Sequence, residues 1–289
     1  MVPNPFYGVI TDPSSILSQP TIQQGYLQRP YPQFLNFELL NAGWGHSNYQ
    51  AGQLTVEHRL NAGLSLLLGY TYSKSIDNIG EGGTQASVQD NGCLSCERSI
   101  ADLDQTHVLR LSTVYELPFG PTKPLVNHGP LSHVLGGWQL GGTYQYNTGQ
   151  PVALTSPIQS ASLGTSGQMR PTLVAGESIT QQMVGKDGEL SSFNPKAFTQ
   201  TAPYAFGNAP RYLSALRLPA FTELDALLQK STQLNERMSL VLRFEALNAL
   251  NSVVFGGPDT GVNDANFGFD PHRQKNNPRI AQVSARWVF

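Results

Sequence analysis

The sequence is short of charged residues. Asp, Glu, Lys and Arg make up 13% of its 289 residues, against roughly 25% in ordinary soluble proteins. This deficit argues against a surface that is wholly exposed to water. Apolar residues do not replace the missing charge, since they account for 39% of the chain and the mean hydropathy is -0.24. Small and neutral polar residues fill the difference.

Long apolar runs and an excess of basic residues are also missing. No run approaches the roughly 18 apolar residues of a spanning helix, so the sequence does not predict a helical membrane protein. A net charge of -2 gives no reason to expect a nucleic-acid partner. The first residues, MVPNPFYGVITDPSS, contain no basic stretch followed by an apolar one, so no secretory signal is predicted.

What the chain does contain is a series of alternating segments. Apolar residues at every second position are typical of a strand with one apolar side. About seven such segments occur, at residues 49–60, 64–74, 106–117, 136–150, 222–232, 236–248 and 279–289. Residues 222–230 and 244–250 also have helical propensity, but the short turn between their segments favours strands. Residues 1–46, which contain Pro30 and Pro32, predict an irregular, extracellular segment.

The connections between these segments alternate between short and long. Such alternation is typical of an antiparallel transmembrane β-barrel of the outer membrane, which has short periplasmic turns and long extracellular loops. A soluble β-sandwich with long binding loops is the alternative fold. On either reading the class is all-β.

The placement of charged and aromatic residues favours the barrel. The apolar faces of four segments carry no charge, and Arg110, Arg243 and Glu245 lie on the opposite faces. With short turns taken as periplasmic, aromatic residues gather at both ends of the apolar faces, as the two membrane interfaces select. The predicted outer girdle is Tyr70, Tyr72, Tyr144 and Tyr146, and the predicted inner girdle is Tyr115, Trp138, Trp287 and Phe289.

Several blocks in the same order resemble the C-terminal half of the barrel in TonB-dependent transporters. They include SNYQAGQLTVEHRLNAGLSLLLGYTYSKSIDN, LSTVYELPFG, GGWQLGGTYQYNTGQPVALT, FGNAPR, ERMSLVLRFEALNALN and NNPRIAQVSARWVF. The most similar group is the Oar-like type of acidobacteria, whose members carry a carboxypeptidase-regulatory-like domain before the plug. The resemblance implies a 22-stranded barrel with a plug, outer-membrane lipid as surroundings, the TonB complex as energy source and an unknown ligand.

The sequence departs from that pattern in having about seven strands and no plug or TonB-contacting segment. Single-chain barrels have an even number of strands, so an unpaired edge strand would need a partner. We therefore expect residues 47–289 to be the C-terminal part of a barrel whose N-terminal strands and plug are missing. The terminal Phe289 resembles the signal that the barrel-assembly machinery recognises.

No catalytic constellation, cofactor site or metal site is predicted. Each of the six histidines is interpreted as a polar loop or interfacial residue. Cys93 and Cys96 form a C-x-x-C pair in a predicted external loop, where the oxidising periplasm favours a small disulfide; free thiols and a metal site are the alternatives. The acidic stretches DPSS, DLDQ and GGPDTGVNDAN are interpreted as solvated turns, with weak Ca²⁺ binding as the alternative.

Three functions stay open at this point. The first is a fragment of an energised outer-membrane importer, which contributes barrel wall and ligand-facing loops at residues 77–105, 149–221 and 250–278. The second is a passive porin-like or adhesin-like barrel. The third is a soluble carbohydrate-binding sandwich. None of these functions is enzymatic.

Overall fold

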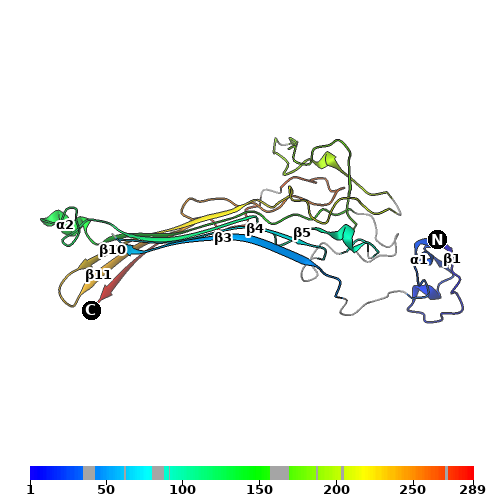
Figure 1. The fold of residues 1–289 in the computed structure, drawn as a ribbon, viewed down its shortest axis with the longest axis horizontal. Coiled ribbons are helices and arrows are strands. Elements are labelled where there is room, and N and C mark those ends of the chain that lie inside the picture. Colours follow the sequence, from blue (N-terminus) through cyan, green and yellow to red (C-terminus); the bar gives the residue numbers. More distant parts are fainter. Residues whose placement is uncertain are drawn as a thin grey trace.

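The computed structural model describes residues 1–34, 43–61, 63–79, 88–90, 92–156, 169–186, 188–202, 205–270 and 273–289. Within them, seven long strands form one antiparallel sheet (Figure 1). They are β3 (Ser47–Asn61), β4 (Leu64–Asp77), β6 (His107–Glu116), β7 (Trp138–Asn147), β10 (Phe221–Gln233), β11 (Ser239–Leu247) and β12 (Ile280–Val288). The seven predicted strands are confirmed, including the two segments that also had helical propensity.

The order of the strands in the sheet follows their order in the chain, so each long strand pairs with its neighbours in sequence. A short additional strand, β5 (Ser99–Ile100), pairs with the end of β4. The described parts of the connections 78–106, 148–220 and 248–279 start from one end of the sheet, here called the outer end. The shorter connections 62–63, 117–137 and 234–238 lie at the inner end, as the alternating lengths predict.

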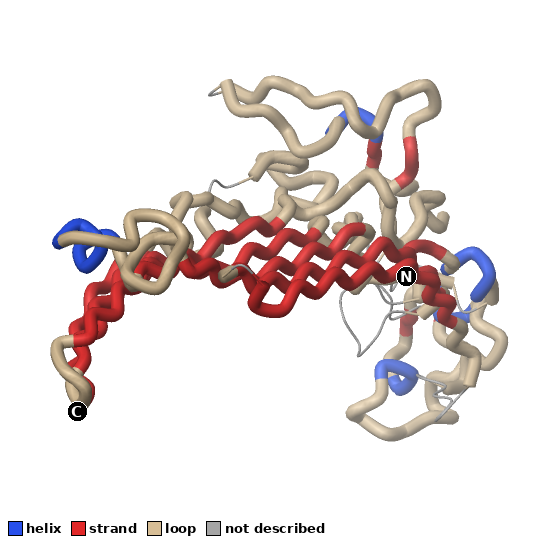
Figure 2. The backbone as a smooth tube through the Cα atoms, turned by 60° about the vertical axis from the view of Figure 1, so that its left-hand side comes forward, coloured by secondary structure: helices blue, strands red, loops and turns tan. Residues whose placement is uncertain are grey.

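The sheet is a single curved layer, as Figure 2 shows. β3 and β12 occupy its two edges, and no pairing joins them among the described residues. The sequence predicted a partial barrel, and the structure contains an antiparallel wall without closure. Each edge strand leaves one row of backbone N–H and C=O groups without a strand partner in the sheet.

The apolar face of this wall is not covered by protein. Every buried apolar side chain of the described residues lies outside the seven long strands. By contrast, Leu54, Phe244 and Val283 on the apolar face are 55%, 41% and 70% exposed. A sandwich would bury these side chains under a second sheet, whereas the other two sheets here are two-residue pairs, β1–β2 and β8–β9. The sandwich alternative does not fit this structure.

A hydrophobic core lies instead in the connections at the outer end. Phe193, Phe198 and Phe267 meet edge to face, with ring centroids 5.2–6.1 Å apart. Leu173 of β8 (Thr172–Leu173) and Ala197 of the 3₁₀ turn η5 (Pro195–Ala197) belong to the same cluster, and Phe198 itself begins β9 (Phe198–Thr199). Because Phe267 comes from 248–279 and the other two rings from 148–220, the two connections pack together as one unit. We call this unit, with the described residues 88–106, the outer cap.

The remaining elements are short. Residues 1–34 contain β1 (Val2–Pro3), η1 (Ile16–Ser18), β2 (Thr21–Ile22) and α1 (Gln24–Leu27), and they lie beyond the outer ends of the strands (Figure 1). The cap contains η3 (Leu94–Glu97), and α2 (Pro130–Leu135) lies in the connection 117–137. None of the described helices has the length and apolar character needed to cross a membrane.

Candidate functional site

The strand register aligns the aromatic residues of the predicted outer girdle. Tyr70 of β4 and Tyr146 of β7 both pair with Leu109 of β6, so all three lie in one row of the sheet. Tyr144 pairs with Leu111 in the next row inward, and Tyr72 pairs with His107 one row further out. The Tyr70 hydroxyl also lies 2.8 Å from His107 Nδ1. These tyrosines therefore form one group on the apolar face, close to the cap.

The residues of the predicted inner girdle lie at the opposite end of the same face. Tyr115 pairs with Leu140, Trp138 with Lys230, and Trp287 with Leu240. Trp287 is 53% exposed and Phe289, just past the end of β12, is 94% exposed. The assignment of both groups to membrane interfaces and of Phe289 to assembly stays a prediction.

The outer cap folds over the polar face of the wall. At the outer end of β4, Tyr72 on the apolar face is 56% exposed, whereas Ser73 and Asp77 on the polar face are 6% and 4% exposed. The Ser73 hydroxyl donates a hydrogen bond to the carbonyl oxygen of Gln105 at 2.9 Å. The backbone N–H of Ser75 donates to Asp104 Oδ1 at 2.7 Å. The polar face is thus covered at this end, and the apolar face stays open.

A buried ion pair between Glu97 and Arg170 joins two parts of the cap. The Glu97 side chain is fully buried and accepts two hydrogen bonds from the Arg170 guanidinium, one of them 3.1 Å long. The backbone N–H groups of Gln89 and Asp90 also donate to Glu97 Oε1, each at 3.2 Å. The carboxylate therefore has the several partners that a buried charge needs.

Two further arginines of the connection 148–220 bind carboxylates near the end of the wall. Arg211 is fully buried, pairs with Asp77 at the end of β4, and donates from Nε to the carbonyl oxygen of Glu97 at 2.8 Å. Arg217 pairs with Asp104 at 2.6 Å and donates to the carbonyl oxygen of Gly149 at 3.1 Å. Together the three pairs fasten the cap to itself and to β4.

These buried pairs correct one expectation. The stretch DLDQ was expected to be a solvated turn or a weak Ca²⁺ ligand, but the Asp104 side chain is 1% exposed and ion-paired. Its partner lies 113 residues away in sequence, which explains why the local pattern did not reveal it. Arg211 ends the block FGNAPR, so the sequence singled out that segment without showing its role.

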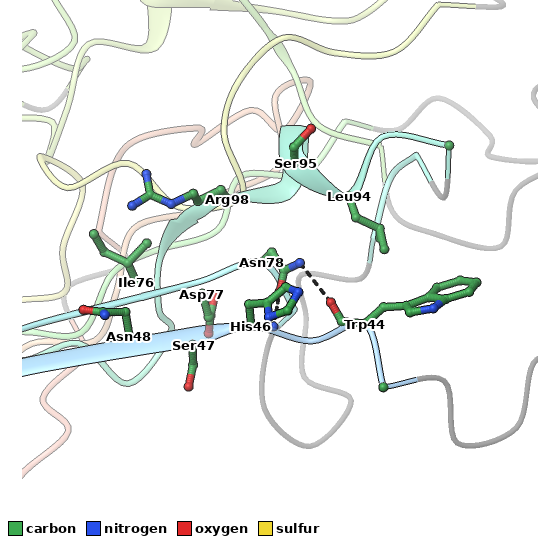
Figure 3. Close-up of a pocket in the computed structure, with 12 residues that line it drawn as sticks. Trp44, His46, Ser47, Asn48, Ile76, Asp77, Asn78, Leu94, Ser95 and Arg98 are labelled. Atoms are coloured by element: carbon green, nitrogen blue, oxygen red, sulfur yellow. Dashed lines mark hydrogen bonds between the residues drawn. The ribbon is translucent and has the colours of Figure 1, made fainter.

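A pocket of about 760 Å³ opens at the outer end of β3 and β4, beside the cap (Figure 3). Asn78 holds one side of the pocket in place. Its Nδ2 donates a hydrogen bond to the carbonyl oxygen of Trp44 at 3.2 Å, and its Oδ1 accepts one from the backbone N–H of His46 at 2.6 Å. Arg98 and the Trp44 ring stand at opposite sides of the pocket in Figure 3. Among the described residues that line the pocket, the one carboxylate is that of Asp77, and it is paired with Arg211.

The disulfide between Cys93 and Cys96 borders this pocket, because Leu94 and Ser95 line it. The bridge spans the start of η3, the turn that ends at the buried Glu97. Both cysteines of the chain take part in it. The bridge therefore closes a loop next to the first ion pair of the cap.

Alkylation tests the state of this pair in the cell. Protein from outer membranes, treated with an alkylating agent under denaturing conditions, is expected to gain no mass unless it is first reduced, because the oxidising compartment favours the bridge. After reduction, two alkyl groups are expected by mass spectrometry. A gain of two groups without reduction would show free thiols and contradict the bridge.

The acidic residues that the structure describes elsewhere in the cap are not grouped as metal ligands would be. The described residues contain no group of three or more His, Cys, Asp and Glu side chains placed to hold a metal ion. In the stretch GGPDTGVNDAN, the negative charge of Asp259 raises the pKa of the neighbouring Asp264. In the same cap, burial raises the pKa of the Tyr212 phenol. His272, expected to be a polar loop residue, lies outside the described residues.

Comparison with known proteins agrees with this geometry. A family profile for an outer membrane beta barrel domain matches residues 4–282, which is nearly the whole chain. No curated protein and no solved structure matches. The family is generally not enzymatic. The chain therefore belongs to the outer membrane beta barrel domain family, and its location is the bacterial outer membrane.

Proposed function

We propose that the chain contributes wall and outer cap to an energised receptor of the TonB-dependent, Oar-like type. The sequence blocks that occur in the same order as in such receptors support this assignment, and so does a wall with one apolar and one polar face. On this proposal the apolar face contacts outer-membrane lipid and the polar face lines the lumen. The free edges of β3 and β12 pair with further strands of a 22-stranded barrel, because unpaired backbone groups in hydrocarbon cost several kcal/mol each.

The observation that carries the proposal is the fold of the cap over the polar face. In a passive porin the lumen leaves an aqueous channel. Here Ser73 and Asp77 on that face are buried under the cap, and Arg211 and Arg217 hold the cap in place. A polar face that is covered at its outer end suits a receptor that admits its ligand through an energy-driven conformational change, and so favours the importer over the porin. An adhesin would need no such cover.

The pocket beside Trp44 is the best candidate for first contact with the ligand. Arg98 is exposed at its edge, and its guanidinium makes no hydrogen bond among the described residues. Together with the His46 imidazole and the Trp44 ring, it provides hydrogen-bond donors and one aromatic surface. This set suits a ligand that carries a negative charge or several acceptor oxygens.

Energy dependence tests the proposed function. Cells that produce the receptor are expected to accumulate its ligand only when the TonB complex is intact, and to bind the ligand at the surface in either case. The readout is uptake of labelled candidate ligands in matched strains with and without TonB. Equal uptake in both strains would contradict the importer and support a passive channel. Phe289 deletion, which should reduce assembly but not change TonB dependence, is the control for receptor level.

A further inference from the structure

The inner end of the apolar face carries one charged residue, Lys230 of β10. It pairs with Trp138, and its Nζ lies 5.1 Å from the centre of the indole ring. The ammonium donates hydrogen bonds to the carbonyl oxygens of His133 (3.1 Å), Val134 (2.6 Å) and Gly136 (3.0 Å). An ammonium has three donors, so all of them are used. On the lipid side of a barrel a lysine is tolerated near an interface, where its cost falls to about 0–1 kcal/mol.

These hydrogen bonds hold the short helix α2 against the apolar face. The three carbonyl groups belong to the last turn of α2 and its C-terminal flank, and Trp138 Nε1 donates to the same Val134 oxygen at 3.2 Å. A six-residue helix is roughly 9 Å long, so the whole of α2 lies close to Lys230. Figures 1 and 2 both place α2 at the end of the sheet opposite the long connections.

The connection 117–137 presents an apolar surface beside Lys230, at the inner end of the apolar face. Leu131 and Val134 are 62% and 61% exposed, and three further apolar residues of the connection are also exposed, namely Leu125, Val126 and Leu135. The connection contains no Asp or Glu. Its lysine, Lys123, is paired with Glu116 at 2.8 Å. Exposed apolar side chains beside a tryptophan and a lysine are typical of segments that lie in a lipid interface.

We propose that the connection 117–137, here called the inner foot, inserts its apolar side chains into the phospholipid leaflet at the inner boundary of the membrane. Lys230 and Trp138 connect the foot to the wall, because both belong to the lipid-facing surface and both bind α2. The apolar surface of the foot is thus continuous with the apolar face of the wall, which a membrane barrel turns toward lipid, and this favours lipid over a periplasmic protein as its neighbour. The inference rests on membership of the barrel family and is independent of TonB.

Fluorescence quenching tests the position of the foot. The assembled barrel that contains this chain, reconstituted into phosphatidylethanolamine and phosphatidylglycerol vesicles, carries a new cysteine in the chain through Leu131→Cys or Val134→Cys, labelled with an environment-sensitive dye. The native cysteines are in a disulfide, so without reduction the dye attaches to the new site. The matched control is Glu236→Cys in the turn 234–238 at the same end of the sheet. Lipids with a nitroxide near the head group serve as quenchers.

Quenching at positions 131 and 134 is expected to exceed that at 236 by about twofold or more, because an interfacial helix is buried ~5–10 Å into the head-group boundary. Equal, water-like signals at all three positions would overturn the proposal. A blue-shifted but unquenched dye at 131 would also overturn it, since the foot would then pack against protein. Adding Lys230→Met should lower the quenching at 131 while the strand content stays unchanged by circular dichroism.

Discussion

Replacing Glu97 by alanine is expected to loosen the outer cap, because this residue joins two of its parts. The change leaves the Arg170 guanidinium, whose side chain is 8% exposed, without its carboxylate, and breaking a buried pair from one side costs about 3–5 kcal/mol. It also removes the acceptor of the Gln89 and Asp90 N–H groups. Hydrogen exchange and limited proteolysis of the connections 78–106 and 148–220 measure the expected loss of protection in the cap.

Two comparisons make this result specific. The pair Glu57–Arg59 on β3 is exposed, at 49% and 84% of the side chains, so Glu57→Ala should change stability by about 1 kcal/mol or less. The double variant Glu97→Leu with Arg170→Met removes both charges, and it should recover much of the loss because apolar replacements of buried pairs are often neutral. If Glu97→Ala leaves the protection of the cap from hydrogen exchange and proteolysis unchanged, the ion pair does not hold the cap.

Replacing Leu66 by arginine is expected to impair insertion of the wall, whereas the same change at Leu67 is tolerated. Leu66 and Leu67 are consecutive in β4, so they lie on opposite faces. Leu66 pairs with Thr113 on the apolar face, between the outer and inner aromatic groups. An arginine at mid-depth on the lipid side costs about 2–4 kcal/mol, and the polar face imposes no such cost.

The measurement is the fraction of the assembled barrel that folds in outer membranes when the chain carries each substitution, followed by heat-modifiable migration in electrophoresis. Leu66→Arg and Leu67→Arg have identical composition and charge, so any difference between them reports the face alone. A larger defect for Leu67→Arg would mean that the assignment of the two faces is reversed. Equal defects would mean that neither face is in contact with lipid.

The wall could be predicted almost completely from the sequence. The alternating period is a local property, since successive side chains of a strand point to opposite faces, and it identified all seven long strands. The lengths of the connections then fixed which strand ends lie together. What the pattern did not show was Lys230: it interrupts the apolar face of β10, and its role became visible through the carbonyl groups of α2 that surround it.

The cap could not be predicted in the same way. Its connections have few regular elements, and their positions depend on pairs such as Glu97–Arg170 and Asp77–Arg211, which join residues 73 and 134 positions apart. No period in a sequence encodes such partners. The same limit applies to the aromatic contacts among Phe193, Phe198 and Phe267, which form the core of the cap.

The sequence by itself thus determined an antiparallel wall with one apolar and one polar face, because that division repeats every two residues along each strand. Only the tertiary structure decided that the long connections fold back over the polar face and that α2 is held at the inner edge of the apolar face. Both features depend on charges and carbonyl groups brought together from distant segments. These contacts stabilise the protein only after the strands have aligned and the connections have closed over the strands.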